Sequence, residues 1–263
     1  MASNNGSSHS QGPVSWTALQ VVIGTFYLIL GASLMLLTVA LIMVKMENVD
    51  PAIVAVISSL LLGLIILMIV WYFALRSKNG SFMILGIRSP RTSGWQLACW
   101  TAGVFLVSVL FTGFYTVIIR HLGIEILLPP EDYSDILLDD IWFVVSFIAL
   151  VLWTPFTEEV FFRGFIYEGF SQTFGDSKAI LLSAGIFSLF HILAGPGVLI
   201  PIFVSGLALA FLYHRTGSLL PCIVVHSIQN SFAVIASFVN VDGPNLSAII
   251  PLEIFSLVEL VVT

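Results

Sequence analysis

Long apolar runs without any charge restrict what this chain can fold into. Residues 17–44, 52–75 and 96–119 contain no Asp, Glu, Lys or Arg. About 20 apolar residues are enough for one helix to cross the apolar part of a bilayer. Charged residues make up 9% of the 263-residue chain, whereas a soluble domain has about 25%. The sequence therefore predicts an all-α polytopic membrane protein rather than a water-soluble one.

Eight transmembrane helices are predicted from these runs. The fourth is too long for one straight crossing, and we expect Pro155 to kink it because proline removes a helix hydrogen bond. The eighth contains Pro251, Glu253 and Glu259, which match no motif, so a full crossing there is left open. The eight spans cover about residues 17–44, 52–75, 96–120, 141–172, 178–194, 197–214, 219–240 and 247–263.

The remaining composition excludes several classes of protein. Residues 1–16 are polar, rich in Gly and Ser and without the positive charge of a signal peptide. We expect them to form a flexible tail ahead of a single integral membrane domain over residues 17–263. Cys99 and Cys222 lack metal-site spacing. The sequence has no basic cluster that would bind nucleic acid and no internal repeat of the kind found in many transporters.

Basic residues indicate the orientation, because Lys and Arg concentrate in cytoplasmic loops. The loop between the second and third predicted spans holds Arg76, Lys78, Arg88 and Arg91. Placing this loop in the cytoplasm puts seven of the nine Lys and Arg residues on that side, together with both chain termini. The opposite orientation stays open if Arg163, which lies inside a span, carries no topological information.

Three ionisable residues lie together inside the fourth span, in the stretch TEEVFFRG. Charges at that depth are expensive and mark functional sites by default. Glu159 and Arg163 are four residues apart on one helix face and can pair, whereas Glu158 points about 100° away round the helix. One arginine cannot neutralise two carboxylates, so Glu158 is left for general acid–base chemistry. The alternative is a buried ion pair that only fixes helix packing.

Two further spans carry polar residues at comparable depth. His191 follows Phe187 by one turn in the fifth span, and His226 and Asn230 share one face of the seventh. We expect these side chains and Glu158 to face one intramembrane cavity that opens to the cytoplasm. The alternatives are a satisfied core histidine at position 191 and an interhelical hydrogen-bond pair in the seventh span.

Taken together, three motifs resemble one known family. EEVFFRG fits Glu-Glu-x-x-x-Arg, FSLFH fits Phe-x-x-x-His, HSIQN fits His-x-x-x-Asn, and RTGSLLP leads into the third. In this order, and on separate predicted spans, they resemble the CPBP (ABI) intramembrane proteases. That family includes the CAAX prenyl endopeptidase called Ras-converting enzyme, together with bacteriocin-processing and self-immunity proteins. The resemblance covers about residues 153–230 and implies a catalytic core at about 141–240.

The resemblance also implies a role for each motif residue. Glu158 and His191 would activate the water that attacks the scissile carbonyl, and His226 and Asn230 would form the oxyanion hole. The neighbouring Glu–Arg pair would support the site. Peptide hydrolysis needs such a base and such donors, and losing one oxyanion donor typically lowers turnover by about 10²- to 10³-fold.

A metal ion is the main mechanistic alternative. Glu158, His191 and His226 match the ligand set of a catalytic zinc site, but the sequence has no His-Glu-x-x-His motif. Asn230 shares a face with His226 and suits an oxyanion donor better than a zinc ligand. We therefore favour a metal-free, glutamate-type mechanism, with zinc as the alternative.

The leading functional hypothesis is an intramembrane endopeptidase that cuts near the C-terminus of prenylated CAAX proteins, whose prenyl chain could stay in the lipid. Processing of other membrane peptides, such as a bacteriocin leader or a signalling peptide, is the nearest alternative. Two further alternatives are a proton-coupled transporter and a non-catalytic membrane scaffold. Transporters of this kind also use intramembrane Glu and His. The expected partners are membrane lipid and a lipidated or membrane-embedded substrate, and nucleic acid is not among them.

Overall fold

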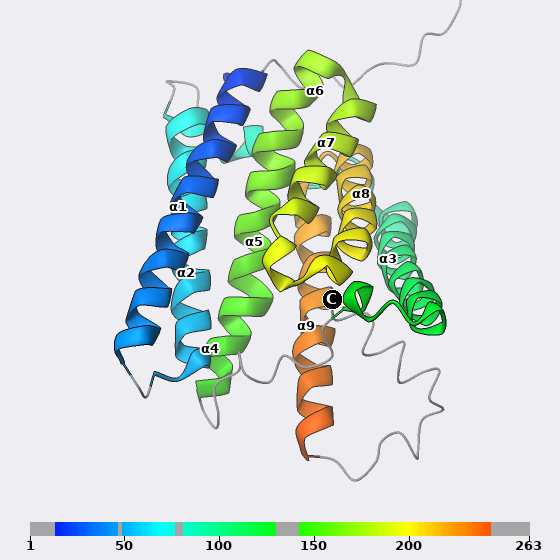
Figure 1. The fold of residues 1–263 in the computed structure, drawn as a ribbon. Coiled ribbons are helices and arrows are strands. Elements are labelled where there is room, and N and C mark those ends of the chain that lie inside the picture. The colour runs from blue at the N-terminus through cyan, green and yellow to red at the C-terminus, as the bar shows by residue number, and fades with distance from the viewer. Residues whose placement is uncertain (1–13, 47–48, 77–80, 130–141, 243–263) are drawn as a thin grey trace, which may run out of the picture.

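The computed structural model describes residues 14–46, 49–76, 81–129 and 142–242 of the chain. The predicted eighth span, residues 247–263, lies outside these ranges. Every regular element within them is a helix, as the apolar runs predict. Figure 1 shows these helices assembled into one bundle.

The helices follow the predicted spans closely. The longest are α1 (Ala18–Lys45), α2 (Pro51–Val70), α3 (Gly94–Leu122), α8 (Leu199–Thr216) and α9 (Leu219–Asp242). The shorter α-helices are α4 (Phe143–Phe147), α5 (Thr154–Glu159), α6 (Glu168–Phe174) and α7 (Asp176–Leu189). The π-helical segments are η1 (Trp71–Leu75), η6 (Ile148–Trp153) and η7 (Val160–Tyr167). The 3-10 turns are η2 (Phe82–Leu85), η3 (Glu125–Leu127), η8 (Ile192–Ala194) and η9 (Pro196–Val198).

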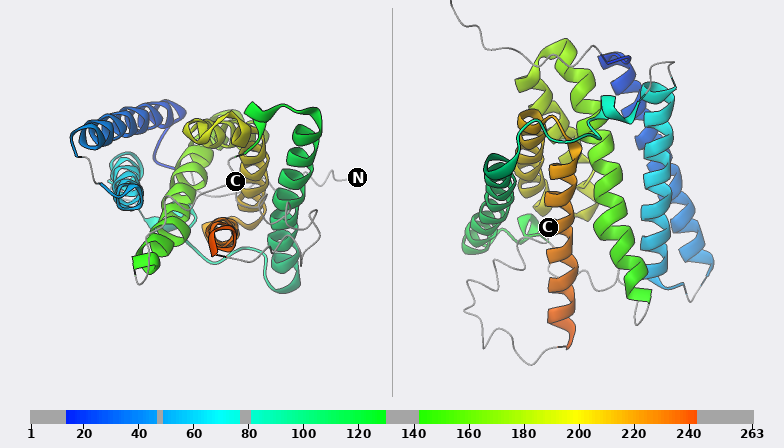
Figure 2. Two further views of the ribbon diagram at one scale, coloured as in Figure 1. Left: turned by 60° about the horizontal axis from the view of Figure 1, so that its bottom comes forward. Right: turned by 180° about the vertical axis from the view of Figure 1, so that it is seen from behind.

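One continuous helix, Phe143–Phe174, runs through the middle of the bundle and comprises α4, η6, α5, η7 and α6. In Figures 1 and 2, α1 and α2 lie on one side of it, and α7, α8 and α9 lie on the other with α3 outermost. The segment η7 contacts α1, α2, α7, α8 and α9. All eight of its residues are buried. The TEEVFFRG stretch therefore lies at the centre of the protein.

Five of the helices are long and apolar enough to cross a membrane. The helix α7 has only 14 residues, which is shorter than a full crossing. The described residues thus support an integral membrane protein, whereas the count of eight spans is not confirmed. The five candidate spans are Ala18–Lys45, Pro51–Leu75, Gly94–Leu122, Phe143–Phe174 and Pro196–Thr216.

Pro155 disturbs the hydrogen bonding of the central helix without ending it. The N–H of Thr154 donates five residues back to the carbonyl of Ala149, instead of the usual four. The helix nevertheless continues to Phe174. The effect expected of this proline therefore takes the form of a π-helical stretch, which is a common way for a helix to absorb such an irregularity.

Two boundaries differ from the sequence-based expectation. Trp16, placed at the end of the polar tail, is 2% exposed; its ring stacks on Phe165 and its Nε1–H donates to the Phe165 carbonyl at 2.9 Å. The helix α7, which corresponds to the fifth predicted span, ends at Leu189 rather than at residue 194. The chain then turns back into α8 through Gly195, whose φ of +110° is favourable only for glycine.

Candidate active site

Two neighbouring carboxylates lie near the middle of the central helix, and they differ in their partners. Glu159 is fully buried, and its Oε1 accepts a hydrogen bond from Arg163 Nη1 at 2.6 Å. The ion pair predicted from the four-residue spacing is therefore present. Glu158 is 14% exposed, and its Oε2 has no hydrogen-bond partner among the residues that the structure describes.

Arg163 connects the central helix to two others. Its Nη2 donates to the carbonyl of Gly206 in α8 at 3.2 Å, and its guanidinium lies 4.5 Å from the centre of the Phe187 ring in α7. A Cβ at position 206 would lie only 3.1 Å from the Phe187 ring. Glycine at this position therefore permits the close approach of α7 and α8 around the arginine.

His226 of α9 lies between the two glutamates. Its Nδ1 is 2.8 Å from Glu159 Oε1, and its Nε2 is 3.7 Å from Glu158 Oε2. An ionised carboxylate only accepts hydrogen bonds, so Nδ1 carries a proton and Nε2 faces Glu158. Residue spacing could not predict this contact, because 67 residues separate the partners. The available signal was the charge imbalance of two glutamates and one arginine.

His191 lies just beyond the end of α7, not within the helix as predicted. Its Nδ1 is 2.9 Å from the carbonyl of Phe187, and the two rings meet edge to face at 4.9 Å. The Phe187 ring also meets the His226 ring edge to face at 5.7 Å. The Phe187 ring therefore contacts both histidines.

Asn230 is held by a backbone carbonyl that Pro155 leaves without its helical partner. In the π register, the N–H of Thr154 bonds to Ala149, so the carbonyl of Leu150 would next pair with the N–H of residue 155, which proline lacks. The Nδ2 of Asn230 donates to this carbonyl at 2.9 Å. The proline thus creates an acceptor that fixes the Asn230 side chain.

The structure connects some of the predicted site residues directly and others only through a neighbouring side chain. The TEEVFFRG charges and His226 form one connected network, and His191 joins it through the Phe187 ring. Within the described ranges, Glu158 and His191 share no hydrogen bond or ion pair. Glu158, His191 and His226 do not form a metal-binding cluster either, because no three His, Cys, Asp or Glu side chains converge in the described part of the chain.

Residues 140–232 match the family model described as type II CAAX prenyl endopeptidase Rce1-like. The chain carries a CPBP/CAAX protease-family domain. The motif residues of the CPBP domain, from Glu158 to Asn230, all fall within the matched segment. No match to the chain was found among curated proteins or solved structures. At family level, the domain and the five candidate spans support a membrane-embedded CAAX-type protease.

Proposed function

We propose that this CPBP protein is an intramembrane endopeptidase that hydrolyses a peptide bond near the C-terminus of prenylated CAAX-type proteins. The unequal partnering of adjacent glutamates carries the proposal. Within the described residues the Oε2 atoms of both glutamates lack a hydrogen-bond partner. Glu159, however, is fully buried and accepts bonds from Arg163 and His226 through its Oε1, whereas Glu158 is 14% exposed and its nearest charged neighbour, His226 Nε2, is 3.7 Å away. A carboxylate with spare acceptor capacity beside an imidazole is suited to take a proton from water.

His191 has the tautomer that this step needs. The Phe187 carbonyl beside its Nδ1 can only accept a hydrogen bond, so Nδ1 carries the proton and Nε2 of the neutral ring has a free lone pair. In the proposal, Glu158 and His191 Nε2 hold one water between them. Glu158 takes a proton from this water as its oxygen bonds to the scissile carbonyl carbon, and the carbonyl oxygen becomes an oxyanion.

Asn230 and His226 are the proposed oxyanion donors. The Asn230 amide has two N–H groups, and the Leu150 carbonyl occupies one of them. His226 can donate from Nε2 only as an imidazolium, because its Nδ1 already bonds to Glu159. Two carboxylates flank this ring, and an imidazolium together with Arg163 would balance both negative charges. TEEVFFRG has two glutamates and one arginine, so it lacks one positive charge. His226 of α9 would supply that charge.

Collapse of the tetrahedral intermediate breaks the carbon–nitrogen bond. Glu158 returns the proton to the leaving nitrogen, which departs as an amine. The carbonyl side becomes a carboxylate, and its remaining proton leaves to solvent. Glu158 is then again ionised, so the cycle needs only peptide and water.

The substrate class rests on the family and on the depth of the site. The matched family model is that of type II CAAX prenyl endopeptidases, and Glu158 lies near the middle of a helix long enough to cross a membrane. A prenyl chain could remain in the surrounding lipid while the peptide enters. We therefore propose prenylated CAAX termini ahead of other membrane peptides.

A cytoplasmic opening is proposed from the distribution of basic residues. Arg88 and Arg91, from the loop before α3, bond to backbone carbonyls at the end of α8: the Nε of Arg88 to Gly217 and the N–H of Arg91 to Thr216. Together with Arg215 in the last turn of α8, these arginines place three basic residues at one end of the bundle, as expected of a cytoplasmic face. Labelling of a cysteine introduced at position 91 from the cytoplasmic side alone would agree with this orientation, and labelling from the opposite side alone would contradict it.

We also propose that the mechanism needs no metal. The Asn230 amide acts as a hydrogen-bond donor, to the Leu150 carbonyl, and Glu158, His191 and His226 do not converge into a three-ligand group within the described ranges. Full turnover in a preparation shown by elemental analysis to lack zinc is the expected result. Turnover that returns only when zinc is added would contradict the proposal.

Cleavage of a farnesylated CAAX peptide by the purified full-length protein tests the function. Wild type should release the C-terminal fragment, whereas Glu158→Ala and His191→Ala should each lower turnover by about 10²-fold or more. Glu125→Ala and His121→Ala are matched controls at exposed positions and should keep wild-type turnover. Equal cleavage of the same peptide without its farnesyl group would redirect the proposal to other membrane peptides. Undiminished cleavage by both site variants would overturn it.

A further inference from the structure

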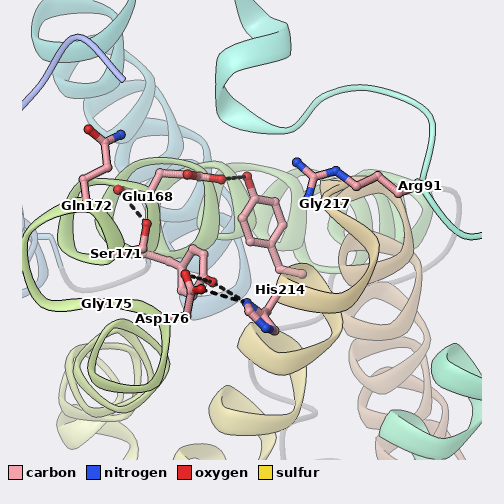
Figure 3. Close-up of a pocket in the computed structure, with 10 residues that line it drawn as sticks. Arg91, Glu168, Ser171, Gln172, Gly175, Asp176, His214 and Gly217 are labelled. Atoms are coloured by element: carbon pink, nitrogen blue, oxygen red, sulfur yellow. Dashed lines mark hydrogen bonds and ion pairs between the residues drawn. The ribbon is translucent and has the colours of Figure 1, made fainter. Parts of the chain in front are cut away.

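A second polar pocket lies at one end of the bundle, away from the glutamate–histidine network. Its volume is about 310 Å³, and the turn between α6 and α7, the end of α8 and the loop before α3 line it. Figure 3 shows its side chains. The residues that matter here are Arg91, Tyr167, Glu168, Asp176, Tyr213 and His214.

The pocket is separate from the proposed active site. Glu168 follows Glu159 by nine positions on the central helix, which corresponds to about 14 Å along the helix axis. None of the motif residues between Glu158 and Asn230 lines the pocket. The pocket instead lies where three candidate membrane spans end: Phe143–Phe174, Pro196–Thr216 and Gly94–Leu122. Such a position corresponds to the head-group layer of a bilayer.

Hydrogen bonds hold the acidic side of the pocket in place. The hydroxyl of Tyr167 donates to Asp176 Oδ1 at 3.0 Å and lies 2.9 Å from His214 Nδ1. Asp176 is 39% exposed, and its Oδ2 lies 3.8 Å from His214 Nδ1, which is beyond hydrogen-bond length. This carboxylate oxygen can therefore accept a hydrogen bond from a ligand.

The floor of the pocket is a buried carboxylate. Glu168 is 5% exposed, and its Oε1 accepts a hydrogen bond of 2.7 Å from the hydroxyl of Tyr213. Arg91 is exposed and lies in Figure 3 on the side away from Asp176. The pocket thus presents a guanidinium on one side and carboxylates on the floor and the other side.

We propose that this pocket binds a phosphoethanolamine group. Arg91 would bind the phosphate, for which its planar guanidinium is well suited. Asp176 Oδ2, above the Glu168 floor, would accept N–H hydrogen bonds from the ammonium. Phosphoethanolamine carries both a phosphate and an ammonium, so one ligand could contact both sides of the pocket. The position at the ends of the spans makes phosphatidylethanolamine in the bilayer the first source to test, and a soluble phosphoethanolamine compound the second.

Lipid titration of the delipidated protein in detergent, followed by native mass spectrometry, tests the proposal. Short-chain phosphatidylethanolamine should bind about tenfold more tightly than phosphatidylcholine, which has no N–H donors, or phosphatidylglycerol, which has no amine. Arg91→Gln should weaken binding of all three lipids. Asp176→Asn should remove only the preference for ethanolamine. Lys178→Gln, exposed and outside the pocket, is the control that should change nothing.

Two results would overturn the proposal. One is equal affinity of the wild-type protein for the ethanolamine and choline lipids. The other is an ethanolamine preference that survives in the Asp176→Asn variant. Competition by soluble glycerophosphoethanolamine separates the two sources: displacement of the lipid at comparable concentration indicates a free ligand, and retention of the lipid indicates a membrane head group.

Discussion

Replacing Arg163 with leucine should strongly destabilise the protein. The side chain is 1% exposed. It forms an ion pair with Glu159, donates a hydrogen bond to the Gly206 carbonyl and lies over the Phe187 ring. Removing one partner of a buried ion pair costs about 3–5 kcal/mol, because the remaining charge is left uncompensated. His226 can still partner Glu159, so we expect the lower end, about 3 kcal/mol. That is a large share of a total stability of about 5–15 kcal/mol.

Unfolding of the purified protein in detergent, followed by tryptophan fluorescence against denaturant, measures this loss. The double variant Glu159→Gln/Arg163→Leu should recover much of the stability, because it removes the uncompensated charge and keeps an acceptor for His226. Lys178→Leu, at an exposed position, should stay within about 0.5 kcal/mol of wild type. The reasoning is wrong if Arg163→Leu is as stable as the control, or if the double variant is no more stable than the single one.

Two further substitutions test the contacts around the site. Asn230→Ala should lower kcat by about 10²- to 10³-fold with little change in KM, and the unpaired Leu150 carbonyl should lower stability by about 1–3 kcal/mol; unchanged kcat would exclude the oxyanion role. Gly164→Ala places a Cβ 2.9 Å from the Leu85 carbonyl and should destabilise by about 1–3 kcal/mol in the same unfolding assay. Wild-type stability of this variant would show that η2 can move away from the central helix.

Features that depend on a single helix could be predicted from the sequence. Apolar runs gave the helical class and most helix boundaries, because a bilayer imposes both length and composition on a crossing segment. The Glu159–Arg163 pair followed from four-residue spacing alone. Apolar runs cannot show where a helix gives way to a turn, and for this reason His191 was placed inside a helix that ends at Leu189.

Features that depend on contacts between helices could not be predicted. The bond between Glu159 and His226 joins residues 67 positions apart, and no periodicity reports which helices face each other. The Asn230–Leu150 contact depends on a π register at Pro155, which the sequence signals only as a generic helix disturbance. The polar pocket at Glu168 was not predicted, because its residues come from three separate parts of the chain and match no motif.

The division of roles between adjacent glutamates is the central claim, and a matched pair of conservative variants tests it most directly. Glu158→Gln and Glu159→Gln each remove one charge and keep the side-chain size. The account predicts that Glu158→Gln lowers kcat on the farnesylated CAAX peptide by about 10²-fold or more while the unfolding midpoint stays at the wild-type value. Glu159→Gln should instead lower the midpoint, because Arg163 and His226 lose their shared carboxylate. Retained turnover in Glu158→Gln, or equal effects of both variants on stability, would contradict the account.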